Sequence, residues 1–158
     1  MDKLHLSTIY ARNCEVRRIQ KPEASAFLAA NHSMGDTVCR YRYGLYVKRR
    51  TGSAEAELEN GTLVAVATFS NARRWKKETG TVASYEWIRY ASLSGFRVVG
   101  AMGKLLDAFV ADVHPDDIMT YCDASRSDGA SYRELGFSEE GTVEKPGFSC
   151  LKFRLVLQ

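Results

Sequence analysis

The sequence predicts one α/β domain with a mixed, mainly antiparallel sheet, flanking helices and a parallel β-α-β crossover. First, Leu63–Phe69 is a nearly continuous apolar run, which is typical of a central strand buried on both faces. Second, apolar residues recur at i, i+3, i+4, i+7, i+8 and i+11 from Met102 to Val113, which predicts an amphipathic helix. Third, strand-like segments flank this helix at Tyr85–Tyr90 and Ile118–Cys122, and such a connection requires a parallel pair.

The remaining elements follow from local signals. Further strands are expected at Arg12–Ile19, Tyr43–Val47 and Phe148–Leu157, and the strand that contains Tyr85–Tyr90 is expected to span Val82–Ala91. A helix is expected from Pro22, a favoured first helical position, to Asn31-His32, and a short one at Ala130–Leu135 that Gly136 can end. The order is β-α-β-β-β-α-β-α-β, and residues 1–158 are expected to form a single domain.

Composition and cysteine usage narrow the class of protein. The 158 residues are 45% hydrophobic and 26% charged, and a net charge of +3 does not by itself indicate nucleic-acid binding. The four cysteines form no CxxC pair, the N-terminus has no apolar signal core, and no apolar run approaches the about 20 residues that span a bilayer. We therefore expect a reduced, cytoplasmic protein without a membrane partner. His5, His114 and Asp116-Asp117 lack ligand spacing, so they are interpreted as surface residues and no metal is expected.

Two groups of basic residues lie in expected connections or beside strands. The first is Arg40, Arg42, Lys48, Arg49 and Arg50, next to a polar segment that contains Gly52, Glu55, Glu57, Glu59 and the hairpin signal Asn60-Gly61. The second is Arg73, Arg74, Trp75, Lys76 and Lys77, on a hairpin loop expected at Asn71–Gly80. Cations around an aromatic ring can hold phosphates and stack a base. Two solvated loops are the simpler interpretation, and both remain open.

A glycine-rich turn, Gly100–Gly103, lies between Val98-Val99 and the predicted helix. Such a turn exposes backbone N–H groups at the positive end of the helix dipole, where a phosphate binds favourably. Glycines needed only for a tight turn would give the same pattern, so the spacing alone leaves both explanations open.

The segment Arg97-Val98-Val99-Gly100-Ala101-Met102-Gly103-Lys104 resembles the pyrophosphate loop of the GNAT acetyltransferase superfamily, Gln/Arg-x-x-Gly-x-Gly/Ala, with Met102 where a small residue is usual. Tyr132-Arg133-Glu134-Leu135-Gly136-Phe137 resembles that superfamily's Tyr-x-x-x-Gly-Phe segment. The resemblance, which covers about residues 14–157, implies that the loop binds acetyl-CoA or another acyl-CoA. It also implies that Tyr132 protonates the departing thiolate. A tyrosine that only packs its ring on the sheet is the alternative.

Further segments resemble a GNAT-related branch that includes phage Mom-type DNA-modification proteins. His32, Glu86, Arg89 and Asp123 match that branch, whereas Ser33 and Cys122 replace a tyrosine and an alanine. In Mom-type proteins the implied chemistry is modification of the exocyclic amine of adenine in DNA.

An amine nucleophile must lose a proton to attack a thioester, and three residues could accept it: Glu86, His32 and Asp123. Each also has a structural alternative. Glu86 could form a cross-strand ion pair, His32 could be a polar residue at a helix end, and Asp123 could cap the following loop.

The sequence thus predicts an acyl-CoA-dependent N-acyltransferase whose acceptor is a small-molecule or macromolecular amine. A Mom-like protein that binds or modifies DNA bases is one alternative. A non-catalytic interaction domain, favoured by Met102, is the other, and a homodimer through the last strands is also considered.

Overall fold

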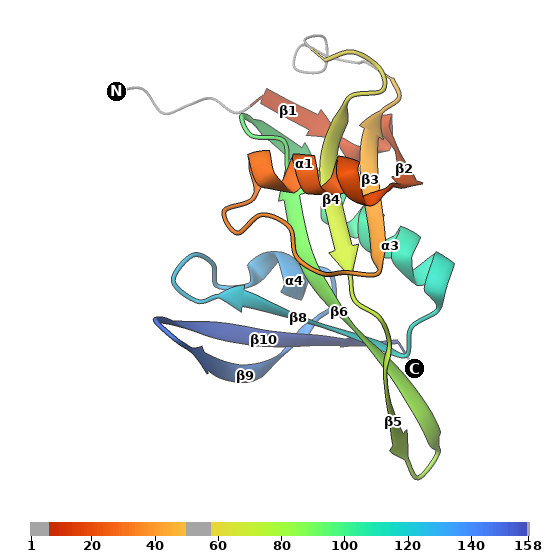
Figure 1. Cartoon of the computed structure of the whole chain (residues 1–158), viewed down its shortest axis with the longest axis vertical. Helices are drawn as coiled ribbons and strands as arrows, with labels where there is room; N and C mark the ends of the chain where they lie inside the picture. The colour runs from red at the N-terminus through yellow and green to blue at the C-terminus, as the bar shows by residue number, and fades with distance from the viewer. Residues whose placement is uncertain (1–6, 50–57, 158) are drawn as a thin grey trace. The chain divides into compact units, whose positions relative to one another are not determined.

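A computed structural model describes residues 7–49 and 58–157 of the chain (Figure 1). In chain order the elements are β1 (Ser7–Tyr10), the 3₁₀ turn η1 (Ala11–Asn13), β2 (Cys14–Arg18), α1 (Lys21–Asn31), β3 (Tyr41–Val47), β4 (Leu63–Phe69), β5 (Arg73–Lys77), β6 (Gly80–Ser92), β7 (Phe96–Val99), α3 (Ala101–Val113), β8 (Asp117–Asp123), α4 (Ala130–Glu134), β9 (Ser138–Lys145) and β10 (Phe148–Val156). They form two compact units. The first unit contains the residues up to Thr68 together with Arg89–Val113, and the second contains Phe69–Ile88 and the residues from His114 on.

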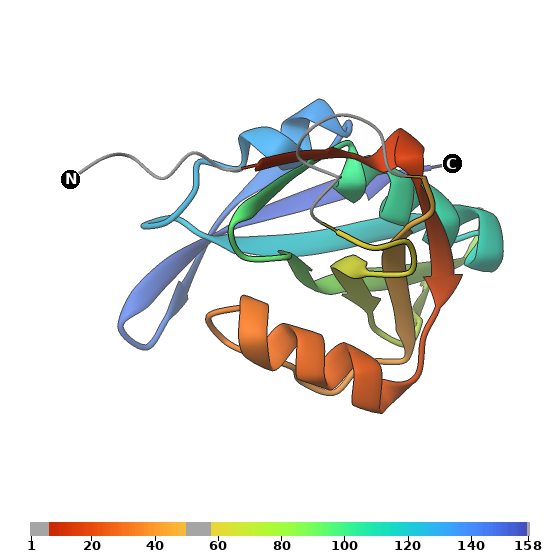
Figure 2. The same cartoon turned by 90° about the horizontal axis from the view of Figure 1, so that it is seen from above.

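In the first unit, the strands of the sheet follow the order β2-β3-β4-β6, and α1 and α3 cover opposite faces of this sheet (Figure 2). The Tyr43 hydroxyl donates a hydrogen bond of 2.6 Å to Asp112 of α3, and the Tyr46 hydroxyl donates one of 2.6 Å to Glu23 of α1. Residues three apart in a strand face opposite sides, so β3 contacts both helices. Because helices cover both faces of the sheet, Val64–Ala67 of β4 are fully buried whichever face they point to. This burial explains why β4 is a continuous apolar run.

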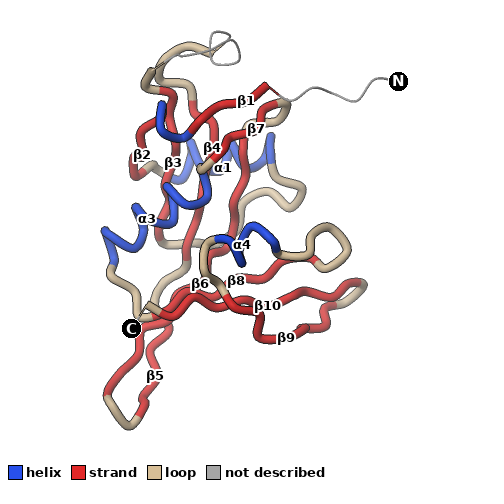
Figure 3. The backbone as a smooth tube through the Cα atoms, turned by 180° about the vertical axis from the view of Figure 1, so that it is seen from behind, coloured by secondary structure: helices blue, strands red, loops and turns tan. Residues whose placement is uncertain are grey.

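In the second unit, the strand order is β6-β8-β10-β9, and β10 lies between β8 and β9 (Figure 3). Strand β8 pairs in parallel with β6 from Ser84↔Asp117 to Glu86↔Met119, which confirms the predicted crossover. Its other edge pairs antiparallel with β10, and β9 pairs antiparallel with β10. The core contains Phe69 stacked on Trp87 at 5.3 Å between ring centroids.

Most elements lie where the sequence predicts them, but the prediction that Asn71–Gly80 forms a loop is wrong. Residues Arg73–Lys77 form β5, which pairs antiparallel with β6 in the register Arg73↔Ser84 to Lys77↔Gly80, so that only Glu78-Thr79 form the turn. All five side chains are exposed. The strand therefore has no buried face, and no apolar alternation could reveal it.

Three further strands, β1, β7 and β9, are absent from the sequence prediction. Strands β1 and β7 have four residues each, and β9 (SEEGTVEK) is polar and mostly exposed, so none carries a strong strand pattern. Some predictions concern residues outside the described part of the chain, namely His5, Arg50, Gly52, Glu55 and Glu57.

The structure also shows where residues interpreted as surface residues lie. Asp117 is buried at 5% exposure and paired with Arg154, so its interpretation as a surface residue is wrong. All four cysteines are free thiols. Within residues 7–49 and 58–157, no helix is both long and apolar enough to cross a membrane, and no cluster of His, Cys, Asp and Glu is arranged to hold a metal ion.

Candidate functional site

The predicted phosphate loop forms the start of α3, in the first unit. Gly100 has φ = 83°, a left-handed conformation that glycine adopts without strain, and it turns the chain from β7 into the helix. The Lys104 N–H donates to the Gly100 carbonyl at 3.1 Å, which is the i→i−4 bond of the first turn. The amides of Ala101, Met102 and Gly103 precede that bond, so they have no acceptor within the helix. Three N–H groups and the helix dipole therefore make this end of α3 suited to an anion.

A hollow of about 500 Å³ lies beside this loop. It is lined by Tyr10, Ala11, Arg12, Val99, Gly100, Gly103, Lys104 and Asp107. Val99 and Gly100 are exposed, as is Arg97 on β7. Sequence reasoning did not find Tyr10 and Arg12, because the parallel pair Tyr10↔Val99 joins segments about ninety residues apart without a local signal.

Lys104, predicted to contact the cofactor, has a different partner in the structure. Its ammonium donates to the carbonyl oxygens of Ala11, at 2.9 Å, and Cys14, at 2.6 Å. Two of its three N–H donors are therefore engaged with the first residue of η1 and with the residue that follows η1. Lys104 thus fastens the N-terminal segment to α3.

Tyr132 lies on α4 in the second unit, among three aromatic rings. Its ring centroid is 5.7 Å from that of Trp87, with the planes at 88°, 5.7 Å from that of Phe137 and 5.8 Å from that of Phe153. Burial raises the pKa of Tyr132 above its ordinary value, against an opposing hydrogen-bond effect of Thr120. The phenol therefore keeps its proton at neutral pH, as a general acid must.

Glu86 stands where the parallel ladder ends. Glu86↔Met119 is the last pair in the register of β6 and β8, although both strands continue beyond it. At the next step the Thr120 hydroxyl donates to the Trp87 carbonyl at 2.9 Å. The Glu86 carboxylate is half-buried and has no hydrogen bond or ion pair with the residues that the structure describes. It can therefore accept a proton without losing a partner.

His32 and Asp123 both have structural roles. His32 ends α1, and its Nδ1 accepts a hydrogen bond of 3.0 Å from the Met34 N–H, which places the proton of the neutral ring on Nε2. Asp123 Oδ1 accepts from the amide and hydroxyl of Ser125, at 2.9 and 2.7 Å. These two bonds hold the pKa of Asp123 below its ordinary value. Asp123 caps the loop after β8, as its structural alternative predicts.

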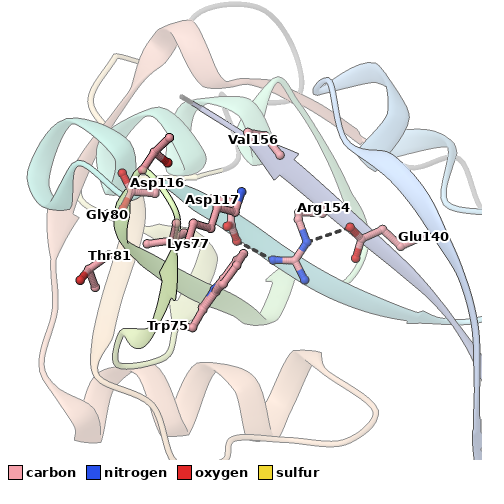
Figure 4. A pocket seen from close by; sticks show the side chains of 11 residues that line it. Trp75, Lys77, Gly80, Thr81, Asp116, Asp117, Glu140, Arg154 and Val156 are labelled. Atoms are coloured by element: carbon pink, nitrogen blue, oxygen red, sulfur yellow. Dashed lines mark hydrogen bonds and ion pairs between the residues drawn. The ribbon is translucent and has the colours of Figure 1, made fainter.

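The second basic group is the exposed strand β5. Its four cations, Arg73, Arg74, Lys76 and Lys77, have no ion pair within the described part of the chain, and the Lys77 ammonium lies 4.9 Å from the centroid of Trp75. Trp75 and Lys77 line a hollow of about 690 Å³ together with Asp117, Arg154 and Glu140 (Figure 4). Of the first basic group, Arg42 donates weakly to the Cys39 carbonyl at 3.4 Å, and the Arg40 guanidinium lies 5.1 Å from the centroid of Tyr41.

Comparisons with known proteins place the fold. No protein-family model and no curated protein matches the sequence. Among solved structures, the chain is similar to an N-acetyltransferase from Staphylococcus aureus (16% identity, TM-score 0.62, covering 92% of this chain and 99% of that one). It is also similar to Arabidopsis thaliana NAA60 in complex with acetyl-CoA (10% identity, TM-score 0.65, covering 91% of this chain and 98% of that one). A third similar structure is a Bacillus subtilis acetyltransferase in complex with CoA (15% identity, TM-score 0.59, covering 92% of this chain and 99% of that one).

A further similar structure, from Desulfovibrio desulfuricans, is described as a putative acetyltransferase of the GNAT family (12% identity, TM-score 0.63). These likenesses show that the chain has the GNAT acetyltransferase fold, which confirms the predicted fold class. At these identities they show the fold alone. The finer resemblance to the Mom-type branch finds no support among these structures.

Proposed function

We propose that this protein is an acyl-CoA-dependent N-acyltransferase that moves an acyl group from acetyl-CoA or another acyl-CoA to an amine. The observation that carries the proposal is the set of amides of Ala101, Met102 and Gly103, which have no acceptor within α3. The support for an acyl-CoA in particular is that two proteins of the same fold were solved with acetyl-CoA or CoA.

In this proposal each step of acyl transfer is assigned to residues of the chain. The amides of Ala101–Gly103 bind the pyrophosphate, and the amine nitrogen attacks the thioester carbonyl. Glu86, directly or through one water, takes the proton that the amine loses, and Tyr132 gives a proton to the departing thiolate. We assign the base to Glu86 rather than His32 or Asp123, because Nδ1 of His32 and Oδ1 of Asp123 already accept hydrogen bonds.

An acyl-transfer assay tests this proposal. Purified protein is incubated with radiolabelled acetyl-CoA and amines of several classes, namely amino acids, polyamines, peptides and oligonucleotides, and both the released CoA thiol and the labelled product are measured. We expect acceptor-dependent thiol release with one class, which Glu86→Gln abolishes. An absence of both CoA binding and thiol release would favour the non-catalytic alternative.

A nucleic-acid amine is the acceptor that a specific observation favours. Four cations that form no ion pair with the described residues flank a Trp75 side chain that is 43% exposed. They lie on one edge strand, where a phosphate backbone and a stacked base could both be held. Binding to a short duplex and to its single strands should weaken as salt rises. Replacing all four cations with Gln should flatten that salt dependence. Salt-independent binding, or none, would remove this acceptor class.

A further inference from the structure

We propose that Arg12 is the side-chain cation that contacts the diphosphate of the cofactor, and that Lys104 positions it. The inference rests on the proposed function, because it concerns the same acyl-CoA site. It differs from the sequence prediction, in which Lys104 itself contacts the cofactor.

Three observations place η1 beside the phosphate loop. Strand β1 pairs in parallel with β7, up to Tyr10↔Val99. The Lys104 ammonium donates to the carbonyls of Ala11, the first residue of η1, and of Cys14, the residue after η1. Ala11 is 5% exposed, and a Cβ added to Gly100 would lie 3.5 Å from the Ala11 Cβ. Arg12 is the next residue, and its exposed side chain lines the same hollow as Gly100 and Gly103.

The charges around the hollow favour an anion near Arg12. The lining contains two cations, Arg12 and Lys104, and one carboxylate, Asp107, so it has a surplus of one positive charge. The Lys104 ammonium is occupied by backbone carbonyls, whereas Arg12 has no acidic partner among the described residues. Its guanidinium lies 4.4 Å from the centroid of Tyr10, a contact that orients the group without neutralising it.

A guanidinium adds what the loop amides lack. The amides of Ala101–Gly103 are neutral donors, and a diphosphate brings two negative charges to them. A guanidinium offers two parallel N–H donors and a full positive charge, a combination that matches phosphate oxygens. Because Arg12 and these amides border the same hollow, we assign Arg12 to the diphosphate rather than to the 3′-phosphate of CoA.

Isothermal titration of Arg12→Gln with three probes tests the assignment: CoA, 3′-dephospho-CoA and pantetheine. We expect about 10- to 100-fold weaker binding of both CoA and 3′-dephospho-CoA, with pantetheine binding unchanged. Arg17→Gln is the matched control, because Arg17 is an exposed cation of the neighbouring β2 outside the hollow, and it should bind all three probes as the unmodified protein does. Arg12 is exposed, so equal melting temperatures should show that Arg12→Gln still folds.

The same titrations can overturn the inference. Unchanged CoA affinity in Arg12→Gln would overturn it and leave the proposed function standing. A loss confined to CoA, with 3′-dephospho-CoA unaffected, would overturn the diphosphate assignment. If the unmodified protein binds no CoA, both the inference and the proposed function fail.

The positioning role of Lys104 needs a separate readout, which a double-mutant cycle supplies. Lys104→Met should weaken CoA binding, because η1 is no longer held to α3. In the Lys104→Met protein, adding Arg12→Gln should reduce CoA affinity by much less than the 10- to 100-fold reduction expected in the unmodified protein. Fully additive losses would overturn the positioning role.

Discussion

Arg154 of β10 donates a hydrogen bond of 2.6 Å from Nη1 to Oδ1 of Asp117 of β8 (Figure 4). The other oxygen of Asp117 accepts from the Ser84 hydroxyl at 2.8 Å, and that hydroxyl in turn accepts from the Trp75 indole at 3.0 Å. Arg154 also donates to Glu140 of β9 at 2.8 Å. One polar chain thus joins β5, β6, β8, β10 and β9 within the second unit.

Asp117→Asn should destabilise the second unit. The Asp117 side chain is 6% exposed and that of Arg154 is 20% exposed, so solvent compensates little for the lost charge. We expect a loss of about 1.5–3 kcal/mol in the free energy of unfolding, the range for a hydrogen bond to a charged group. Chemical denaturation measures it. Glu15→Gln, which removes the exposed ion pair with Arg17, is the control and should have no measurable effect. Equal stabilities of the two variants would contradict the account of this network.

Tyr132→Phe should lower the rate of acyl transfer without unfolding the protein. The ring contacts with Trp87, Phe137 and Phe153 remain, while the proton for the thiolate is lost. We expect kcat to fall about 100-fold or more, with CoA affinity unchanged. Steady-state kinetics and CoA titration separate the two effects. A variant with full kcat would show that Tyr132 has only a packing role.

Gly129→Ala should disturb the start of α4. Gly129 has φ = 80°, and an added Cβ would overlap the ring of Phe153. We expect a loss of about 1–3 kcal/mol from overpacking, in addition to the backbone strain. Gly147→Ala is the matched control, because Gly147 has a similar φ of 85° but open space around it. The difference between their denaturation midpoints measures the overlap, and no difference would count against the packing of Phe153 on Gly129.

Asp123 should titrate below its ordinary pKa because of Ser125. The hydroxyl and the amide of Ser125 stabilise the carboxylate, and Ser125→Ala removes the hydroxyl. A depressed folded-state pKa means that the cap stabilises the fold above the unfolded value of about 3.9 and is lost as pH falls through the folded value. NMR titration should show the pKa of Asp123 rising in Ser125→Ala. An unchanged value would contradict the capping role.

The elements that sequence could predict have strong apolar patterns. Leu63–Phe69 matches β4 residue for residue, and the stripe from Met102 to Val113 matches α3. These segments bury one or both faces against the core, so the positions of their apolar residues in the sequence reveal the type of element. Strand β5 shows the opposite case, because its pairing with β6 depends on backbone hydrogen bonds and leaves every side chain exposed.

The site was predictable only where a local motif exists. Gly100–Gly103 and Tyr132 lie in short motifs, so the sequence alone could single them out. Arg12 reaches the loop through β1–β7 pairing and the Lys104 contacts, which join distant segments. The structural roles of His32 and Asp123 depend on Met34 and Ser125, neighbours whose hydrogen bonds no spacing rule specifies.

The central claim is that the start of α3 binds the diphosphate of an acyl-CoA, and CoA titration of two variants at Gly100 tests it most directly. Gly100→Ala and Gly100→Asp both place a side chain at φ = 83°, and both should incur a similar backbone strain of about 1–2 kcal/mol. Only Gly100→Asp adds a negative charge beside the amides of Ala101–Gly103. The account predicts that Gly100→Ala retains measurable CoA binding while Gly100→Asp loses it. Equal CoA affinity in two folded variants would contradict the claim.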